Sequence, residues 1–408
     1  MNSSLNITSL FLPVWTLLVL GFLMAFVITW YTIPSIVTIA RMKNLCSEPN
    51  GRTSHMAITP NLGGIAIFIG FVLSTVIFAG DFFHFELKYI IAGSIIVFFI
   101  GIKDDILIIA PMKKLAGQIF AAGLVAVLAD IRINDLYGLF YIHQLPYLVS
   151  IFLTIFVFIV IINGFNLIDG IDGLASGIGI VTASVLGIWF WVSGNQGYTI
   201  LSFSLVGTLS AFFYFNVFDK KNKIFLGDTG SLVTGFVISI LACRFLQFQL
   251  VADDLAVIES APAIIFGVLV IPLFDSLRVF ILRIKDGRSP FKADHQHLHH
   301  HLLGLGCTHL QATSILISVN LFFIGLSFYF DRIGIIWLMV LILGTASLLA
   351  SLLVRLATRK RREKMDSVLE LFFIVKTLKK RISILESVKK NVRRLPVLPH
   401  MERRRVMG

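Results

Sequence analysis

Charge-poor segments long enough to cross a membrane as helices recur along the whole chain. A bilayer core about 30 Å thick needs roughly 20 apolar residues in a helix. Charged residues make up 14% of the chain and hydrophobic residues 57%, whereas a soluble domain has about 25% charged residues. We therefore predict an all-α, polytopic integral membrane protein with about eleven transmembrane helices, at 10–40, 62–79, 89–102, 115–129, 147–162, 174–193, 199–218, 231–248, 261–282, 310–330 and 334–354.

Lys and Arg residues are unequally divided between the two sides of the predicted membrane. With alternate loops on opposite sides, 13 fall in one set of loops and 17 more lie from Arg355 onward, against Lys88, Arg132 and Arg332 on the other side. Because positive loops face the cytoplasm, we predict an outside N-terminus and a cytoplasmic C-terminus. No basic n-region or small-residue cleavage site accompanies the first apolar segment, so we expect it to remain as an anchor.

The net charge of +12 comes from the C-terminal segment, because residues 355–408 hold 17 Lys and Arg against five Asp and Glu, while residues 1–354 hold 18 of each. We predict a membrane-embedded domain at 1–355 and a basic cytoplasmic tail at 356–408. The tail is either solvated or an amphipathic helix on anionic membrane lipids. It lacks aromatic interleaving, so we expect no nucleic-acid binding. Apolar residues recur in it at helical spacing: Leu371, Ile374, Leu378, Ile382, Leu385 and Val388.

Polar residues gather at the predicted cytoplasmic ends of three apolar runs. Such side chains at a membrane edge are costly unless they bind a ligand, although helix caps and turns use the same residue types. Three-residue steps predict that the third group lies along one strip of helix surface. We predict one composite site from these groups, which are Asp104 with Asp105, Asp228, and the series Asn163, Asn166, Asp169 and Asp172.

Several neighbours extend this predicted site. Asp104 and Asp105 point about 100° apart on a helix, so one suits a metal and the other a substrate or a supporting contact. Asp228 opens a helix, where a carboxylate beside free N–H groups either caps the helix or holds magnesium and a diphosphate. Phe225 is placed to stack on a nucleobase. Two lysines before the fourth segment either face a diphosphate or only mark the cytoplasmic side: Lys113 and Lys114.

Five histidines occur within seven residues of the loop after the ninth segment. Since magnesium prefers oxygen ligands, we assign them to phosphate contacts or proton handling rather than to zinc. A solvated polar loop is the alternative. The three cysteines have no metal-type spacing, and we expect neither a disulfide nor zinc from Cys46, Cys243 and Cys307.

Four motifs together resemble, in order and spacing, the polyprenyl-phosphate N-acetylhexosamine-1-phosphate transferases, which are glycosyltransferase family 4. The resemblance spans about residues 10–355, and residues 52–64 resemble the family's first cytoplasmic loop. The motifs are Asp104-Asp105 with Pro-Met-Lys-Lys-Leu-Ala-Gly-Gln at 111–118, Asn-Gly-Phe-Asn-Leu-Ile-Asp-Gly-Ile-Asp-Gly-Leu-Ala at 163–175, Phe-Leu-Gly-Asp-Thr-Gly-Ser at 225–231, and His-Gln-His-Leu-His-His-His-Leu-Leu at 295–303.

The resemblance implies transfer of a sugar 1-phosphate from a UDP-sugar to undecaprenyl phosphate at the bacterial inner membrane. UMP would be released, and Mg²⁺ would be the cofactor, with Mn²⁺ as a substitute. Asp228 and Asn166 would contact the metal, while Asp104 and Asp105 would position the metal complex or the lipid phosphate. The remaining roles would be uridine contacts from Asp169, Asp172 and Phe225, sugar-diphosphate contacts from His297, His299 and His300, and further substrate binding by Lys113, Lys114 and Asn163.

The histidine motif resembles the branch that primes cell-envelope polysaccharides with N-acetylglucosamine phosphate more than the peptidoglycan branch. The phospho-N-acetylmuramoyl-pentapeptide transferase is therefore the second candidate. Two departures are a stretch from Asn216 to Phe225 about two residues longer than the family pattern, and His301 where arginine is frequent. An ion-coupled transporter would instead place acids near mid-membrane and show internal repeats. The identity of the sugar and a homodimer stay open.

Overall fold

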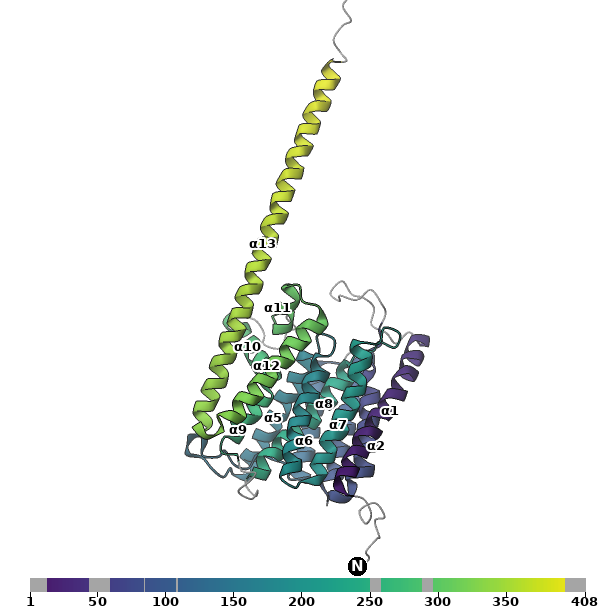
Figure 1. Cartoon of the computed structure of the whole chain (residues 1–408), viewed down its shortest axis with the longest axis vertical. Helices are drawn as coiled ribbons and strands as arrows, with labels where there is room; N and C mark the ends of the chain where they lie inside the picture. The colour runs from purple at the N-terminus through teal and green to yellow at the C-terminus, as the bar shows by residue number, and fades with distance from the viewer. Residues whose placement is uncertain are drawn as a thin grey trace, which may run out of the picture. The chain divides into compact units, whose positions relative to one another are not determined.

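The computed structural model describes residues 13–43, 59–83, 85–107, 109–249, 258–287 and 296–392. Apart from an isolated bridge between Asp135 and Gln144, these residues form helices and loops and no strand. The longer helices of the first 353 residues run side by side (Figure 1). The predicted all-α, polytopic membrane fold is confirmed at this level.

Thirteen α-helices and three short 3₁₀ turns make up the described chain. The 3₁₀ turns are η1 (Gly80–Phe82), η2 (Leu139–Tyr141) and η3 (Asp331–Ile333). The α-helices are α1 (Val14–Met42), α2 (Gly63–Ala79), α3 (Glu86–Leu107), α4 (Pro111–Leu128), α5 (Tyr147–Ile168), α6 (Leu174–Val192), α7 (Gln196–Val217), α8 (Gly227–Gln249), α9 (Ala261–Val268), α10 (Val270–Lys285), α11 (Leu298–Gly304), α12 (His309–Tyr329) and α13 (Ile335–Val392).

By length and composition, nine helical segments of the described chain are candidate membrane spans. The pair α9 and α10, bent by 83°, would make a tenth if it forms one span. α3 has 22 residues but is not among these candidates. Five charged residues explain this, namely Glu86, Lys88, Lys103, Asp104 and Asp105. The count of eleven spans and the orientation of the termini stay predictions.

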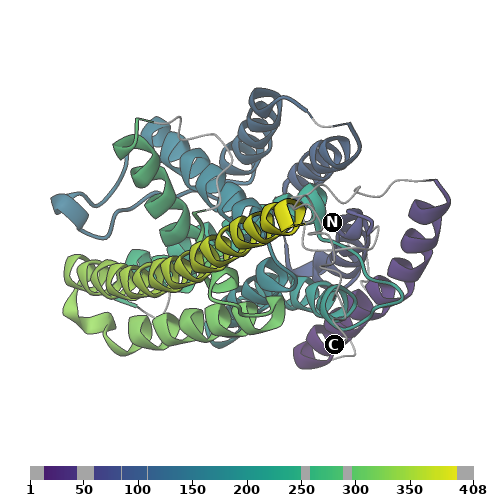
Figure 2. The same cartoon turned by 90° about the horizontal axis from the view of Figure 1, so that it is seen from above.

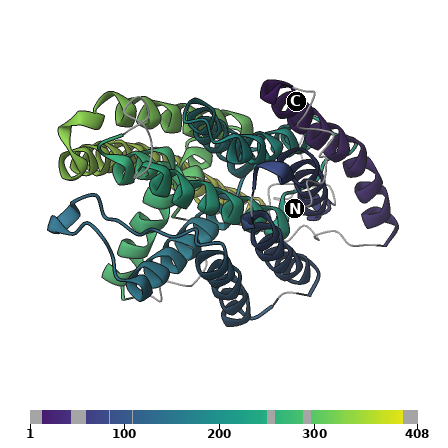
Figure 3. The ribbon, with the colours of Figure 1, turned by 90° about the horizontal axis from the view of Figure 1, so that it is seen from below.

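α8 is the most buried of the candidate spans, since 83% of its apolar window lies inside the protein, against 28% for α1. It packs against α2, α3, α5 and α6. Two glycines allow the closest approaches: a Cβ on Gly64 would lie 2.1 Å from the nitrogen of Gly230, and one on Gly101 would lie 2.4 Å from the Cα of Thr229. The first turn of α8 is therefore held tightly between α2 and α3. Figures 2 and 3 show the bundle from its two ends.

The chain divides into two units, residues 1–353 and 354–408. The first contains α1 to α12 and the beginning of α13. In the second, α13 continues to Val392. The predicted boundary between residues 355 and 356 and the amphipathic contact of the tail with lipids stay predictions, and residues 393–408 lie outside the described part.

Candidate functional site

The three acidic segments that the sequence singled out meet at one end of the helix bundle. They lie at the end of α3, after the end of α5 and at the start of α8, and α4 begins beside them. α8 packs against α3 and α5, and α4 also packs against both of these helices. Four helices therefore contribute to one polar region at the edge of the bundle.

Asp105 binds the first turn of α8. Its Oδ1 accepts a hydrogen bond from the backbone nitrogen of Asp228 at 2.7 Å. Its Oδ2 accepts from the backbone nitrogen of Thr229 at 3.0 Å and from the Thr229 hydroxyl at 2.6 Å. The first amides of a helix lack partners within the helix, and here a carboxylate from another helix supplies them. Asp105 therefore caps the N-terminus of α8, which is the helix-cap alternative for these acidic residues.

Asp104 faces a different partner, the ammonium of Lys114 on α4. Lys114 Nζ lies 2.9 Å from Asp104 Oδ2 and 3.1 Å from Asp228 Oδ1. Asp104 Oδ1 accepts from the backbone nitrogen of Ile109 at 2.8 Å. On the far side, the amide of Asn166 donates to Asp228 Oδ1 and, at 3.0 Å, to a serine hydroxyl of α8. The structure thus brings a cation between the carboxylates of α3 and α8.

These residues fit a hard divalent cation. Within the described chain no group of three or more His, Cys, Asp and Glu side chains is arranged to hold a metal ion. The carboxylates of Asp104 and Asp228 nevertheless offer the oxygen ligands that Mg²⁺ prefers, and the amide of Asn166 contacts Asp228 beside them. The position of the Lys114 ammonium shows that a positive charge is stabilised between the two carboxylates. The donor set suits Mg²⁺ better than zinc.

Asn163 lies one turn before Asn166 on α5 and contacts α4 instead of the carboxylates. Its amide donates to Gln118 Oε1 at 2.9 Å and to the carbonyl of Ile159 at 2.8 Å. Gln118 is buried, with 1% of its surface exposed. Polar contacts therefore continue one turn below the site, toward the interior of the bundle.

The segment 163–173 is helical only in its first half. α5 ends at Ile168, and Gly173 takes a left-handed conformation with φ +77° before α6 begins. The predicted single helical strip is therefore wrong for Asp169 and Asp172, which lie in the connecting turn. A glycine can adopt this conformation at little cost, so the chain reverses there.

The carboxylate of Asp172 contacts a lysine ammonium and a histidine ring. Lys223 Nζ lies 2.7 Å and His309 Nδ1 lies 3.1 Å from Asp172 Oδ2. Burial alone would raise the pKa of this carboxyl, but the hydrogen bonds and charges of His309 and Lys223 outweigh it and lower the pKa. Asn216 fixes the same turn, because it accepts from the Gly173 nitrogen at 2.6 Å and donates to the Ile224 carbonyl at 2.8 Å.

Asp169 differs electrostatically from Asp172. Burial raises its pKa well above the usual value, and the carboxylates of Asp228, Asp105 and Asp172 raise it further. Burial without a nearby cation favours the neutral acid. The pKa values of the two acids in this turn are therefore shifted in opposite directions.

Phe225 lies beside Asp172 through their shared neighbour Lys223, whose ammonium is 5.7 Å from the ring centroid. Its backbone is fixed on both sides: its nitrogen donates to the Pro60 carbonyl at 2.8 Å, and its carbonyl accepts from the Gly63 nitrogen at 3.0 Å. The ring is half-buried. An aromatic face, a lysine and a carboxylate are therefore grouped at one side of the site.

The histidine motif continues into α11 and lies next to the turn between α5 and α6 that carries Asp169 and Asp172, here called the acidic turn. A Cβ on Gly170 would lie 2.3 Å from Nε2 of His299, so this ring rests on the turn. The rings of His299 and His300 are 4.3 Å apart, and those of His297 and His299 are 5.7 Å apart and nearly parallel. Burial, and next the neighbouring His300, lower the pKa of His299 to about 3. His299 is therefore a neutral ring at physiological pH.

The sequence model of the family described as Glycosyl transferase family 4 matches residues 87–246. The match covers Asp104, Asp105, the acidic turn and Asp228, which are the groups that the structure brings together. Over residues 87–246 the chain is therefore similar to glycosyl transferase family 4.

The chain is also similar to bacterial undecaprenyl-phosphate N-acetylglucosaminyl 1-phosphate transferases. It is 28% identical over 279 residues to the undecaprenyl-phosphate alpha-N-acetylglucosaminyl 1-phosphate transferase of Escherichia coli O157:H7, covering 67% of this chain and 73% of the relative. It is 28% identical over 331 residues to the probable undecaprenyl-phosphate N-acetylglucosaminyl 1-phosphate transferase of Bacillus subtilis, covering 78% of this chain and 87% of the relative.

Not every residue predicted for the site lies in it. Lys113 is exposed, whereas Lys114 is central. Residues 52–58, 294 and 295 lie outside the described part. Sequence reasoning missed Gln118, Lys223, Asp275, Arg278 and His309. Charged residues inside the apolar segment 261–282 were the available signal for Asp275 and Arg278, because a charge within a span needs a partner.

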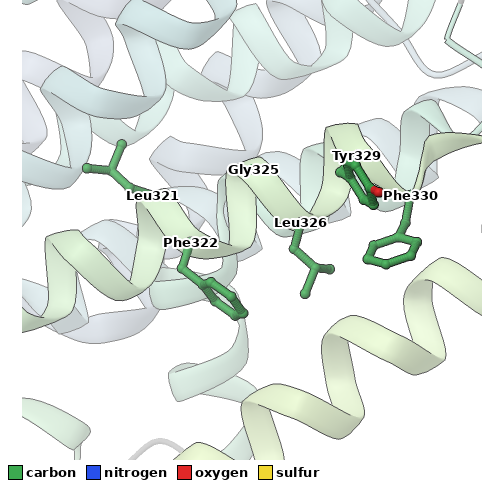
Figure 4. A pocket seen from close by; sticks show the side chains of 6 residues that line it. All are labelled: Leu321, Phe322, Gly325, Leu326, Tyr329 and Phe330. Atoms are coloured by element: carbon green, nitrogen blue, oxygen red, sulfur yellow. The ribbon is translucent and has the colours of Figure 1, made fainter.

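A separate apolar hollow lies further along α12. Leu321, Phe322, Gly325, Leu326, Tyr329 and Phe330 line it (Figure 4). It begins 12 residues beyond His309, which is about 18 Å along the helix. α12 is a candidate membrane span, so this hollow suits lipid contact and is separate from the polar site.

Proposed function

We propose that the chain transfers N-acetylglucosamine 1-phosphate from a UDP-sugar to undecaprenyl phosphate, releases UMP and thereby primes a cell-envelope polysaccharide. The observation that carries the proposal is the Lys114 ammonium between the Asp104 and Asp228 carboxylates, at the end of apolar helices. A soluble, charged donor and a membrane lipid can meet only at such a polar edge. The names of the family 4 relatives favour N-acetylglucosamine over the peptidoglycan substrate.

Asp228 and Asn166, with Asp104 beside them, would hold Mg²⁺, for which Mn²⁺ could substitute. When bound, the ion would neutralise the diphosphate and the charge that develops on the transferred phosphoryl group. Lys114 would lie next to the same diphosphate. Its ammonium contacts both carboxylates, so it balances their charge in the absence of substrate.

The nucleotide would lie over Phe225, with Asp172 and Lys223 as polar contacts to uridine. The backbone hydrogen bonds of Phe225 to Pro60 and Gly63 hold its main chain in place, which lowers the cost of ordering this residue on binding. His299 and His300 would line the sugar-diphosphate side because His299 rests on Gly170. A neutral imidazole suits hydrogen bonding there more than charge pairing.

We propose direct displacement for the transfer. An oxygen of the lipid phosphate would form a bond to the phosphorus that carries the sugar, and the bond from this phosphorus to the oxygen of UMP would break. A phosphate monoester has its second pKa near 6, so the lipid is mostly dianionic at pH 7 and needs little help from a base. Both oxygens of Asp105 already accept hydrogen bonds from α8, which disfavours a phospho-aspartyl intermediate on it.

Direct displacement predicts that enzyme with UDP-sugar alone releases no stoichiometric UMP and carries no labelled sugar phosphate. Rapid-quench measurement of UMP with and without undecaprenyl phosphate tests this. A burst of UMP without lipid that disappears in Asp104→Asn would establish a covalent route instead.

The reaction would take place at the cytoplasmic face of the bacterial inner membrane. The distribution of Lys and Arg between the loops supports this side. All the acids of the site lie at one end of the bundle, whereas a transporter would need them near mid-membrane.

A radiolabel transfer assay tests the function directly. Purified protein in lipid is given undecaprenyl phosphate, Mg²⁺ and each of a panel of UDP-sugars, and labelled lipid is counted. We expect product with UDP-N-acetylglucosamine and none from Asp228→Asn, which keeps the shape of the side chain but loses its charge. Product from UDP-N-acetylmuramoyl-pentapeptide alone would favour the peptidoglycan reaction, and no product with any donor would refute the function.

A further inference from the structure

A buried carboxylate on α10 holds the start of the histidine helix α11. Asp275, only 2% exposed, places Oδ2 3.0 Å from Nδ1 of His297, and both of its oxygens lie 3.2 Å from the backbone nitrogen of Leu298. Arg278, one turn later, places Nη2 3.0 Å from Asp275 Oδ1 and donates with the same atom to the carbonyl of Gln296. Two residues of α10 thus tie three consecutive residues of the histidine motif.

These contacts determine which nitrogen of His297 carries hydrogen. The guanidinium of Arg278 and the N–H groups around Asp275 favour the ionised carboxylate, which can only accept hydrogen bonds. Nδ1 of His297 must therefore be the donor. A neutral imidazole with hydrogen on Nδ1 has its lone pair on Nε2, and this atom can accept a hydrogen bond or a proton.

The His297 ring is linked to the acidic turn through His299. Its ring is 5.7 Å from that of His299, with only 6° between the two planes. His299 in turn rests on Gly170, beside Asp169. A rotation of His297 would therefore disturb the ring that contacts the site.

Resting on the proposed transferase function, we propose that Asp275 is a positioning residue: it fixes His297 with hydrogen on Nδ1 and presents Nε2 as an acceptor on the sugar-diphosphate side. Asp275 acts through His297 and touches no substrate itself. Misplacing a substrate-positioning group by about 1 Å can slow a reaction by about 10²-fold. Loss of the correct tautomer should therefore lower kcat by about 10²-fold while KM for both substrates changes little.

The test is Asp275→Asn in the full-length protein in lipid nanodiscs. An amide nitrogen would donate where a carboxylate oxygen accepted, so it favours hydrogen on Nε2 of His297. The ring ¹⁵N shifts of labelled histidine report the tautomer, with His297→Gln used for assignment. We expect the Nδ1–H signal of His297 to be lost and kcat to fall. A His297 that keeps this signal, or a kcat within twofold of wild type, overturns the inference.

Two further variants separate positioning from folding. In His297→Asn the amide N–H can replace Nδ1–H toward Asp275, but no atom stands at Nε2, so the protein should fold and kcat should fall as in Asp275→Asn. An active His297→Asn enzyme overturns the inference even if Asp275→Asn fails to fold. Asp331→Asn is the matched control, because Asp331 also accepts from backbone nitrogens, of Ser260 at 2.8 Å and Glu259 at 3.2 Å, and belongs to no site. Its kcat should be unchanged.

Failure of the proposed function gives a different result from failure of this inference. If the wild-type protein transfers no sugar phosphate from any UDP-sugar, the function is wrong. The ¹⁵N measurement needs no substrate, so it still decides whether Asp275 sets the tautomer.

Discussion

Replacing Asp105 by asparagine should destabilise the protein far more than the same change at Asp104. Asp105 accepts three hydrogen bonds from the first turn of α8, at 2.7, 3.0 and 2.6 Å. Hydrogen bonds to charged groups contribute about 1.5–3 kcal/mol each. Asparagine keeps one acceptor oxygen. Its amide nitrogen would replace the other carboxylate oxygen, so the donor groups bound to that oxygen would lose their acceptor. We expect the free energy of unfolding to fall by about 2–4 kcal/mol.

Asp104→Asn is the matched control, since it removes one negative charge from the next residue. Its oxygen can still accept from the Ile109 nitrogen, and the main loss is the ion pair with Lys114. We expect a smaller loss of stability than in Asp105→Asn, because Lys114 keeps Asp228 as a partner, with transfer activity strongly reduced. Equilibrium unfolding by sodium dodecyl sulfate in mixed micelles measures both variants. An Asp105→Asn protein within 1 kcal/mol of wild type, or one more stable than Asp104→Asn, would refute this division of roles.

Three other predictions test the nucleotide side, the tail and the acidic turn. Phe225→Ala should raise KM for the UDP-sugar by the loss of a stacking contact worth about 1–3 kcal/mol, and an unchanged KM would make the ring a packing residue only. Deletion of residues 361–408 should leave transfer in detergent intact but weaken binding to anionic vesicles, and an inactive, folded truncation would place the tail in the site. Because the pKa of Asp172 is lowered in the folded protein, its contribution to stability should be present above about pH 4 and be lost as the pH falls further. Thermal unfolding at several pH values should show this loss in wild type and not in Asp172→Asn.

The sequence predicted the helices well where apolar residues alone determine them, and less well at polar helix ends. α3 was expected at 89–102 but runs from Glu86 to Leu107, and α4 was expected at 115–129 but begins at Pro111. The charged residues that ended the predicted segments belong to the helices because other helices supply their partners. Asp105 is paired by α8, and Lys114 lies between two carboxylates. The hydropathy of one segment does not reveal contacts that other helices make with it.

The sequence predicted the main residues of the candidate site but not which residues would contact them. Spacing indicated that Asp104, Asp228 and the 163–173 segment belong together, because each ends or begins an apolar run on the same side. It could not show that Asp172 would be held by Lys223 and His309, which follow it by 51 and 137 residues. Partners so distant in sequence depend on how α7, α8 and α12 pack around the turn. They become visible only once the helices are assembled.

The adjacent acids of α3 show how one short motif can serve both fold and chemistry. Neighbouring residues on a helix point about 100° apart, so two carboxylates in sequence must face different surroundings. Asp105 faces the start of α8 and satisfies three of its donors, which fixes the position of Asp228. Asp104 faces Lys114 and, through it, the carboxylate of Asp228. The residue that holds α8 therefore sets the distance between the two carboxylates that we propose to surround the cation, so activity should depend on Asp105 through geometry and on Asp104 through charge.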